Sequence, residues 1–303
     1  MKYLLSITFI CACLTTVRAQ IDSLDFDNKP EEIKIRSAFS GSTIISGQST
    51  NVSDAGQLWV IIGHRFGTVK TGAFNAFGLD EAVMRMGFEY GIIDQLSAGI
   101  GRSTAGKNYD GYLKYRLLTQ SKGAPAGNMP ATVTLFTSVA FSSQRLRILN
   151  NSSDENYFIS NLVYTYQAMV SRKVSSWLTL QISPTMIHRN QTDLESLAHN
   201  AYALGSGLQI KLRGKLSLNV DYSYVWNKDK LSVSTLYDPI GVGLEVVTGG
   251  HVFKLHFTNS VGIIEKEYLL NTTDDFFKGD VRFGFTLLRS FIVKPKVKGG
   301  TIY

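Results

Sequence analysis

The chain has 303 residues, a formal net charge of +7 and 44% hydrophobic residues. Past its first twenty residues it has no run near the ~18 consecutive apolar residues that a membrane-spanning helix requires. Its basic residues are spread out, apart from Lys294, Lys296 and Lys298 near the end. Such a distribution is typical of solvated loops, so we expect no nucleic acid among the partners.

The N-terminus has the pattern of a secretory signal peptide. Lys2 supplies a basic start, residues 3–14 form a short apolar stretch, and residues 17–19 (Val-Arg-Ala) provide a small-residue cleavage site. We therefore expect residues 1–19 to be removed during export. This cleavage takes away Lys2 and Arg18 and no acidic residue, so the net charge falls from +7 to +5.

The only two cysteines, Cys11 and Cys13, lie inside this signal. A lipoprotein-type cleavage box at Cys13 is the alternative, although the apolar stretch before it is short for that purpose. An ordinary signal leaves a mature chain without cysteine, which excludes a disulfide or a thiolate metal site.

From residue 55 onward, apolar and polar residues alternate with a period of two. Between Lys215 and Trp226, every even-numbered residue is apolar or aromatic, while Lys215, Ser217, Asn219 and Asp221 occupy the other face. Side chains alternate across a β-strand in this way. A run of this length is long for a globular strand but suits a tilted membrane strand of ~9–11 residues.

The same alternation, interrupted by short and long connections in turn, predicts twelve antiparallel strands. A soluble sandwich also alternates, but long apolar faces with aromatics at the strand ends favour a transmembrane up-and-down β-barrel. Short connections should face the periplasm and long ones the exterior. The expected strands are 56–66, 82–91, 94–103, 108–119, 130–143, 157–171, 176–188, 199–212, 214–228, 240–248, 250–259 and 279–291.

This interpretation divides the chain into four parts. The signal peptide is 1–19, the barrel is 56–291, and 292–303 is a basic C-terminal tail. Residues 20–55 are an N-terminal arm, a lumen plug or an extra strand, and the sequence leaves these three open. The expected location is the outer membrane, where the barrel contacts lipid after insertion by the barrel-insertion machinery.

Several phrases of the sequence resemble a family of Bacteroidota outer-membrane barrels known as domain of unknown function 5777. The resemblance is carried by residues 63–67 (GHRFG), 77–80 (FGLD) with Arg85, 99–103 (GIGRS), 114–118 (KYRLL) and 279–285 (GDVRFGF). It extends from about residue 35 to 291 and implies a barrel fold in the outer membrane. The family implies no established activity, and the residues that follow Phe291 depart from the aromatic ending of many such barrels.

The best functional feature of the sequence is the polar face that would line the lumen. It carries seven basic and five acidic residues, a near balance that suits cross-lumen salt bridges as well as a selective pore. The candidates are Arg85, Glu89, Asp110, Lys114, Arg116, Lys211, Lys215, Asp221, Glu245, Lys254, Asp280 and Arg282, with His256 beside Lys254 in a polar network.

Three other motifs are weaker. Residues 101–108 (GRSTAGKN) resemble a phosphate-binding loop, but they lack the terminal hydroxyl and precede a strand, which predicts a hairpin loop. Residues 74–82 break the alternation and predict an external loop with an aromatic rim, or a lid. The five histidines form no metal-binding spacing, so we expect neither a metal nor a cofactor.

A membrane-embedded hydrolase is the enzymatic alternative, because a phospholipase of this size class carries a lipid-facing His-x-Ser pair. Here the closest match is His256-Phe257-Thr258, which should face the lumen, so we expect no enzyme. The sequence therefore favours a narrow channel or transport barrel for an unknown small solute. A non-conducting structural or assembly barrel ranks second.

Overall fold

A computed structural model describes residues 32–123, 127–144 and 157–294. Twelve antiparallel strands form a closed barrel, with each strand paired to its neighbours in the chain and the last strand paired to the first. The predicted barrel and its strand count are confirmed. The strands are β2 (Gln57–Thr68), β3 (Ala82–Ile93), β4 (Leu96–Ser103), β5 (Asn108–Leu118), β7 (Thr132–Ser142), β8 (Val163–Lys173), β9 (Leu178–Arg189), β10 (Asn200–Arg213), β11 (Leu216–Val225), β12 (Ile240–Thr248), β13 (His251–Thr258) and β14 (Arg282–Ile292).

Most strand boundaries shift by one to three residues from the sequence-based prediction, and two of the differences have a clear local cause. The segment expected to open a strand at residue 157 is a helical turn, α3 (Tyr157–Ser160), and the strand β8 starts only at Val163. The last strand starts at Arg282 rather than at 279, because Gly279 adopts a left-handed φ of 84° after the short helix η5 (Phe276–Lys278). Both differences lie at the same end of the barrel, where the connections are long.

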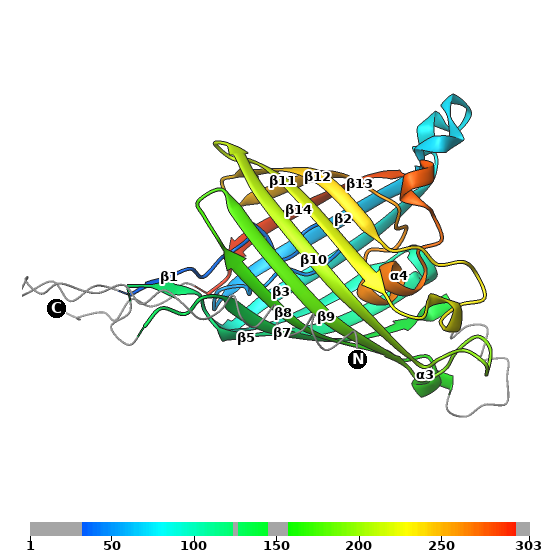
Figure 1. Ribbon diagram of the computed structural model, residues 1–303, viewed down its shortest axis with the longest axis horizontal. Helices are drawn as coiled ribbons and strands as arrows, with labels where there is room; N and C mark the ends of the chain where they lie inside the picture. The colour runs from blue at the N-terminus through cyan, green and yellow to red at the C-terminus, as the bar shows by residue number, and fades with distance from the viewer. Residues whose placement is uncertain (1–31, 124–126, 145–156, 295–303) are drawn as a thin grey trace, which may run out of the picture.

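The connections differ in length between the two ends of the barrel (Figure 1). At the short-turn end, β12 and β13 are joined by Gly249 and Gly250 alone, with Thr248 paired to His251. Both glycines have positive φ, 37° and 91°, as a two-residue turn of the type that suits twisted strands requires.

Short helices occupy most of the long connections of the barrel. At the long-loop end these are η1 (Val69–Thr71), η2 (Ala73–Gly78), η3 (Ala105–Lys107), η4 (Lys228–Lys230) and α4 (Glu265–Leu270), together with α3 and η5. None of the helices in the described ranges is long and apolar enough to cross a membrane. A two-stranded ladder of β1 (Ile33–Lys34) and β6 (Ser121–Lys122) lies outside the short-turn end.

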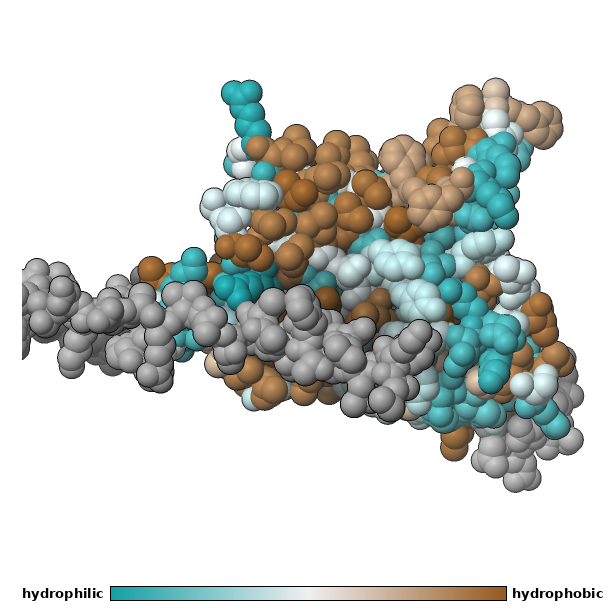
Figure 2. Space-filling model, in the orientation of Figure 1, coloured by the Kyte–Doolittle hydropathy of each residue, from teal (hydrophilic) through white to brown (hydrophobic). Residues whose placement is uncertain are grey.

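The alternation of side chains follows the predicted register. On β5, Leu113 and Tyr115 are exposed on the outer face, whereas Tyr112 and Lys114 are buried in the lumen. The outer faces of the strands form a broad apolar surface (Figure 2). Apolar groups outside and polar groups inside reverse the order of a soluble domain, as a barrel in lipid requires.

This register predicts the effect of a charge on the outer face. Leu113→Arg places a cation near the middle of β5, where it should cost about 2–4 kcal/mol of folding free energy in a bilayer. Leu117→Arg makes the same change on the same face near the strand end, where the cost should be about 0–1 kcal/mol. Urea-dependent folding into lipid vesicles measures both values, and equal losses would show that depth in the membrane does not determine them.

Candidate functional site: a plugged lumen

A segment that precedes the barrel strands fills the middle of the lumen. Residues 38–53, which we call the plug, are rich in serine, threonine and glycine, and most of them are buried. A tight hairpin forms its centre: Thr43 pairs with Gln48, and the Ile44 amide donates to the Gly47 carbonyl at 2.8 Å. Residues 38–53, part of the segment 20–55 for which the sequence leaves three alternatives open, thus lie inside the barrel.

One wall carboxylate receives the tip of the hairpin. Oδ2 of Asp221, on β11, accepts hydrogen bonds from the amides of Ile45, Ser46 and Gly47 at 3.1, 2.7 and 2.8 Å. Three convergent amides form a strong site for an anionic oxygen, since hydrogen bonds to a charged group are about twice as strong as neutral ones. Asp221 therefore fixes the plug in its position across the lumen.

Basic side chains from two other wall strands, β13 and β5, hold the same hairpin. Lys254 on β13 donates to the carbonyls of Thr43 and Ile44, and Lys114 on β5 donates to the carbonyl and hydroxyl of Ser42. The plug thus presents amides to an acid and carbonyls to bases. Much of its binding therefore uses the backbone, with additional bonds from hydroxyl groups such as that of Ser42.

Neutral polar side chains complete the plug's contacts. Gln181 on β9 bonds both the Thr50 amide and the Gln48 carbonyl, at 3.0 and 2.8 Å. Thr134 on β7 donates to the Thr50 carbonyl at 2.8 Å, and Gln209 on β10 reaches the Ser40 hydroxyl at 3.3 Å. The plug is consequently bonded around the circumference of the barrel and closes its middle.

The inward charges divide the wall into two arcs. On β11–β14 and β2–β5 the inward positions carry most of the charged groups, whereas the middle of β7–β10 presents threonine, serine, glutamine and small or apolar side chains. Within the charged arc, oppositely charged groups pair with one another. The distances between the charged atoms are 2.5 Å for Arg85–Asp110, 3.5 Å for Lys114–Glu89 and 3.2 Å for Lys254–Glu245.

The structure places most of the predicted lumen residues on the inner face. Those buried there are Arg85, Glu89, Asp110, Lys114, Arg116, Asp221, Glu245, Lys254 and His256. Arg282 lies at the long-loop end of β14, where its Nε donates to Asp274 at 2.8 Å. Its neighbour Asp280 precedes the strand and pairs with Lys70 at 2.9 Å in the loops, so its assignment to the lumen was wrong.

Two further expectations need correction. Lys211 and Lys215 are exposed at the short-turn end rather than enclosed in the lumen. His256 is buried between Gly243 and Gly284, but neither of its ring nitrogens has a hydrogen-bond partner among the described residues, so it does not join a polar network. No described histidine bonds a serine or threonine hydroxyl, and the residues described contain no cluster of metal-ligating side chains.

Lys211 and Lys215 border a cavity of about 410 Å³ between the plug and the short-turn end. Lys173 and Phe39 also line this cavity, which we call the vestibule. In the described part of the chain these three lysines form no ion pair with an acidic group. The vestibule therefore carries a local positive charge that the balanced lumen does not have.

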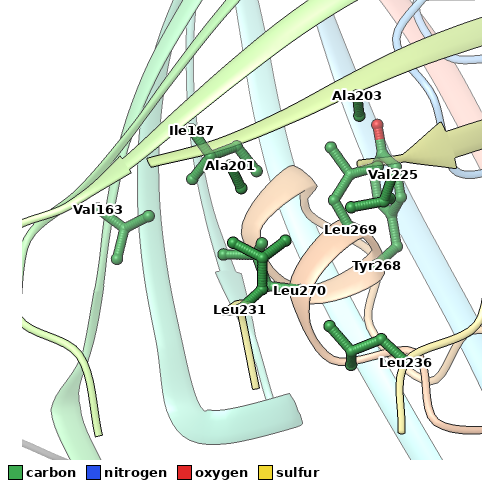
Figure 3. Packing of buried hydrophobic residues seen from close by; sticks show 10 residues of the cluster. All are labelled: Val163, Ile187, Ala201, Ala203, Val225, Leu231, Leu236, Tyr268, Leu269 and Leu270. Atoms are coloured by element: carbon green, nitrogen blue, oxygen red, sulfur yellow. The ribbon is translucent and has the colours of Figure 1, made fainter. Parts of the chain in front are cut away.

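A second group of residues fills the lumen at the long-loop end, and this group is apolar rather than polar. The helix α4 from the β13–β14 connection turns into the barrel and packs Tyr268, Leu269 and Leu270 against inward apolar groups (Figure 3). We call α4 and this cluster the cap. Wall residues of the cluster come from β8 to β11, and Leu231 and Leu236 come from the loop that precedes β12. The wall members are Val163, Ile187, Ala201, Ala203 and Val225.

Sequence reasoning missed the cap and one wall residue. Arg65 on β2 is buried and donates to the Ser46 hydroxyl at 2.8 Å and to the carbonyls of Ser260 and Gly262. Ile61, Gly63 and Arg65 follow one another at a spacing of two residues in β2. This alternation could have placed Arg65 on the inner face of the barrel from the sequence alone. No comparable signal marked α4, because its apolar residues lie in a long connection of mixed composition.

The cap touches the plug through one side chain. Nε2 of Gln48 donates to Oε1 of Glu265 on α4 at 2.8 Å. Glu267, also on α4, accepts from Asn108 and from the Ile263 amide. Burial raises the pKa of both carboxyl groups above their usual range, although these hydrogen bonds oppose the shift.

These features define a membrane β-barrel with an internal plug. Residues 39–291 match the family described as "Membrane bound beta barrel domain (DUF5777)", and the chain belongs to this family. No curated protein matches the sequence. The family assignment agrees with the resemblance seen in the sequence.

Solved structures show the same kind of fold at low identity. The NanC porin is 12% identical, with 77% of this chain and 98% of that chain covered and a TM-score of 0.48. The KdgM porin is 10% identical over 78% and 99% of the two chains, with a TM-score of 0.44. LpxR from Salmonella typhimurium is 12% identical over 77% and 99%, with a TM-score of 0.37. At these identities the likeness concerns the fold alone.

The plug geometry predicts the effect of removing the Asp221 charge. In Asp221→Asn a neutral oxygen replaces the carboxylate, which should weaken the docking of the hairpin by about 1–3 kcal/mol. Amides 45–47 should then exchange hydrogen about tenfold faster or more, as mass spectrometry of the plug measures. Asp280→Asn, a loop carboxylate remote from the plug, is the matched control, and equal exchange in the two variants would contradict the anchoring role.

The raised pKa values of Glu265 and Glu267 predict a pH-dependent cap. A carboxyl group whose folded pKa lies above its unfolded value stabilises the fold most at low pH and loses this contribution as pH rises through the folded pKa. Exchange of the α4 amides, corrected for intrinsic rates, should therefore be faster at about pH 8 than at about pH 5. The double variant Glu265→Gln/Glu267→Gln should remove most of this difference, and an undiminished difference would assign it to other groups.

Proposed function

We propose that this protein is an outer-membrane channel for a small solute and that the plug closes its pathway in the described state. The proposal includes export by the signal at residues 1–19, insertion by the barrel-insertion machinery and an origin in Bacteroidota, which the family resemblance implies. With this orientation the short-turn end faces the periplasm.

The polar character of the plug's contacts is the observation that supports a channel best. The plug buries a small apolar cluster of Ala38, Phe39 and Ile44, but its contacts with the wall are mainly hydrogen bonds. Each bond to a neutral wall group contributes about 0.5–1.5 kcal/mol net and each bond to a charged group about 1.5–3 kcal/mol, because water can replace the partner. Water entering the lumen can therefore compensate for displacement of the plug.

The arrangement of the wall charges supports the same conclusion. Three acid–base pairs connect wall to wall, so they persist when the plug leaves. Of the charged wall groups that bind the plug, only Asp221 and Arg65 form no ion pair among the described residues. An unplugged lumen thus remains a lined, hydrated passage with few unpaired charges.

The vestibule supports a weak preference for anions. Lys173, Lys211 and Lys215 lie where a solute crosses the short-turn end, and their local charge raises the concentration of anions there. The paired charges deeper in the lumen add little to this preference.

An engineered disulfide between the plug and the wall tests the proposal, with conductance measured in planar bilayers. An ideal Cβ built on Gly241 lies 3.3 Å from the Cβ of Ile45, close to the ~3.5–4.5 Å of a disulfide. In Ile45→Cys/Gly241→Cys, oxidation should hold the plug in place and abolish conductance, and reduction should restore it. The mature chain offers no competing cysteine, because Cys11 and Cys13 lie in the signal.

Deletion of residues 20–53 is the complementary change and should produce steady, discrete conductance steps with a weak anion preference. Folding of this variant is checked by its heat-dependent gel shift. A correctly folded deletion variant that does not conduct would overturn the proposal. That result would favour a non-conducting structural barrel, the second candidate, which the simultaneous presence of plug and cap supports.

A further inference from the structure

Four strongly exposed apolar side chains gather on two neighbouring loops at the long-loop end. Phe74, Phe77 and Leu79 belong to the β2–β3 connection, and Phe277 belongs to the β13–β14 connection; their exposed fractions are 96%, 56%, 52% and 87%. We call these four residues the knob. Exposed aromatic groups of this size are uncommon on a surface without a partner.

The two loops are tied together beneath the knob. The Val69 amide donates to the Val281 carbonyl at 2.8 Å, and Lys70 pairs with Asp280 at 2.9 Å. The knob is therefore a single surface formed by the β2–β3 and β13–β14 connections together.

The backbone of the first loop is held in a costly conformation that projects the aromatic side chains. Ala76 and Phe77 have left-handed φ angles of 45° and 55°, which are unfavourable for residues other than glycine. The Phe77 amide donates to the Gly72 carbonyl at 2.7 Å, and Gly78 packs against the backbone of Gly67. Such strain persists only where the surroundings impose it, and it gathers at functional positions.

The position of the knob points to the membrane surface. In Figure 1 the first loop, coloured cyan, projects outward beyond the barrel wall at the long-loop end, and Figure 2 shows apolar atoms at this projection with hydrophilic atoms at its base, which we call the neck. Directly below, on the outer faces of β2 and β14, aromatic rings stack: Phe66 on Phe283 at 5.8 Å and His64 on Phe285 at 5.1 Å. Aromatic belts of this kind mark the membrane–water boundary.

The small size of the knob argues against a protein partner. A stable protein interface buries about 800 Å² on each partner and involves about 20–30 residues a side. Four side chains at the tip of a narrow projection provide far less. A lipid surface needs no such area, because a few aromatic groups at headgroup depth suffice to anchor a segment.

We propose that the knob inserts into the headgroup layer of the leaflet beside the long-loop end and anchors the barrel there. Phe74 and Phe277 enter the layer, while Lys70 and Asp280 remain in water at the neck. The barrel then contacts its membrane at two levels, through the aromatic belt on its wall and through the knob beside it.

Site-directed labelling tests this arrangement. Phe74→Cys in the mature chain gives a single thiol for an environment-sensitive fluorophore, and Asp229→Cys in the exposed β11–β12 connection is the matched control at the same end. Both proteins are folded into phosphatidylcholine vesicles with and without a headgroup-spin-labelled lipid. We expect blue-shifted emission and strong quenching at position 74, and aqueous emission with little quenching at position 229.

A second measurement avoids the label. Hydrogen exchange of amides 70–78 in the unmodified protein should be several-fold slower in vesicles than in a lipid-free amphipathic polymer, and Phe74→Ser/Phe277→Ser should abolish this difference. Aqueous emission at position 74 together with equal exchange in the two media would overturn the proposal. Protection that depends on protein concentration rather than on lipid would also overturn it, and would assign the knob to contact between two copies of the chain.

Discussion

Every main-chain amide and carbonyl that faces hydrocarbon must find a partner within the protein, because lipid offers none. A sheet meets this requirement only when it closes, and here β14 pairs with β2 along almost their whole lengths. Other features of the barrel follow from this closure of the sheet. It makes one face of each strand apolar, creates an interior out of contact with lipid, and allows charged side chains such as Glu89 and Lys114 to be buried there as pairs.

The interior is closed by two devices that differ in chemistry. The plug is held mainly by hydrogen bonds of its backbone and hydroxyl groups, whereas the cap packs leucine and tyrosine side chains against apolar wall residues. Apolar contacts of the cap exclude water and depend little on hydrogen bonding. The hydrogen bonds of the plug can be replaced by water. The Gln48–Glu265 contact joins the two devices, so a disturbance at the exterior has a direct route to the centre of the lumen.

The barrel was predictable from the sequence because period-two alternation is a local property of each strand. Lys114 and Leu113 could be assigned to opposite faces without knowledge of their neighbours, and the short and long connections then supplied the strand count. Asp280 was misplaced because Gly279 ends the regular backbone before the strand begins. That boundary depends on the loop hydrogen bonds and not on the polarity pattern.

The plug and the cap were harder to foresee for a physical reason. The amides of residues 45–47 bind Asp221, and every residue except proline has such an amide, so the contact has no side-chain signature. Arg65 was overlooked although it alternates correctly, since the lumen set was drawn from segments of cleaner pattern. The inward turn of α4 depends on matching apolar groups from β8 to β11, which lie far from it in the sequence.

The position of the plug in the chain also bears on assembly. Only residues 54–56 separate the plug from β2, which is one of the two strands at the closing seam. A plug attached there need not be threaded through a finished ring. It can enter the open sheet sideways before β2 pairs with β14, and its contacts with Lys114, Asp221 and Lys254 connect distant parts of the wall. The segment that fills the lumen is thus placed to act as a template around which the wall can curve.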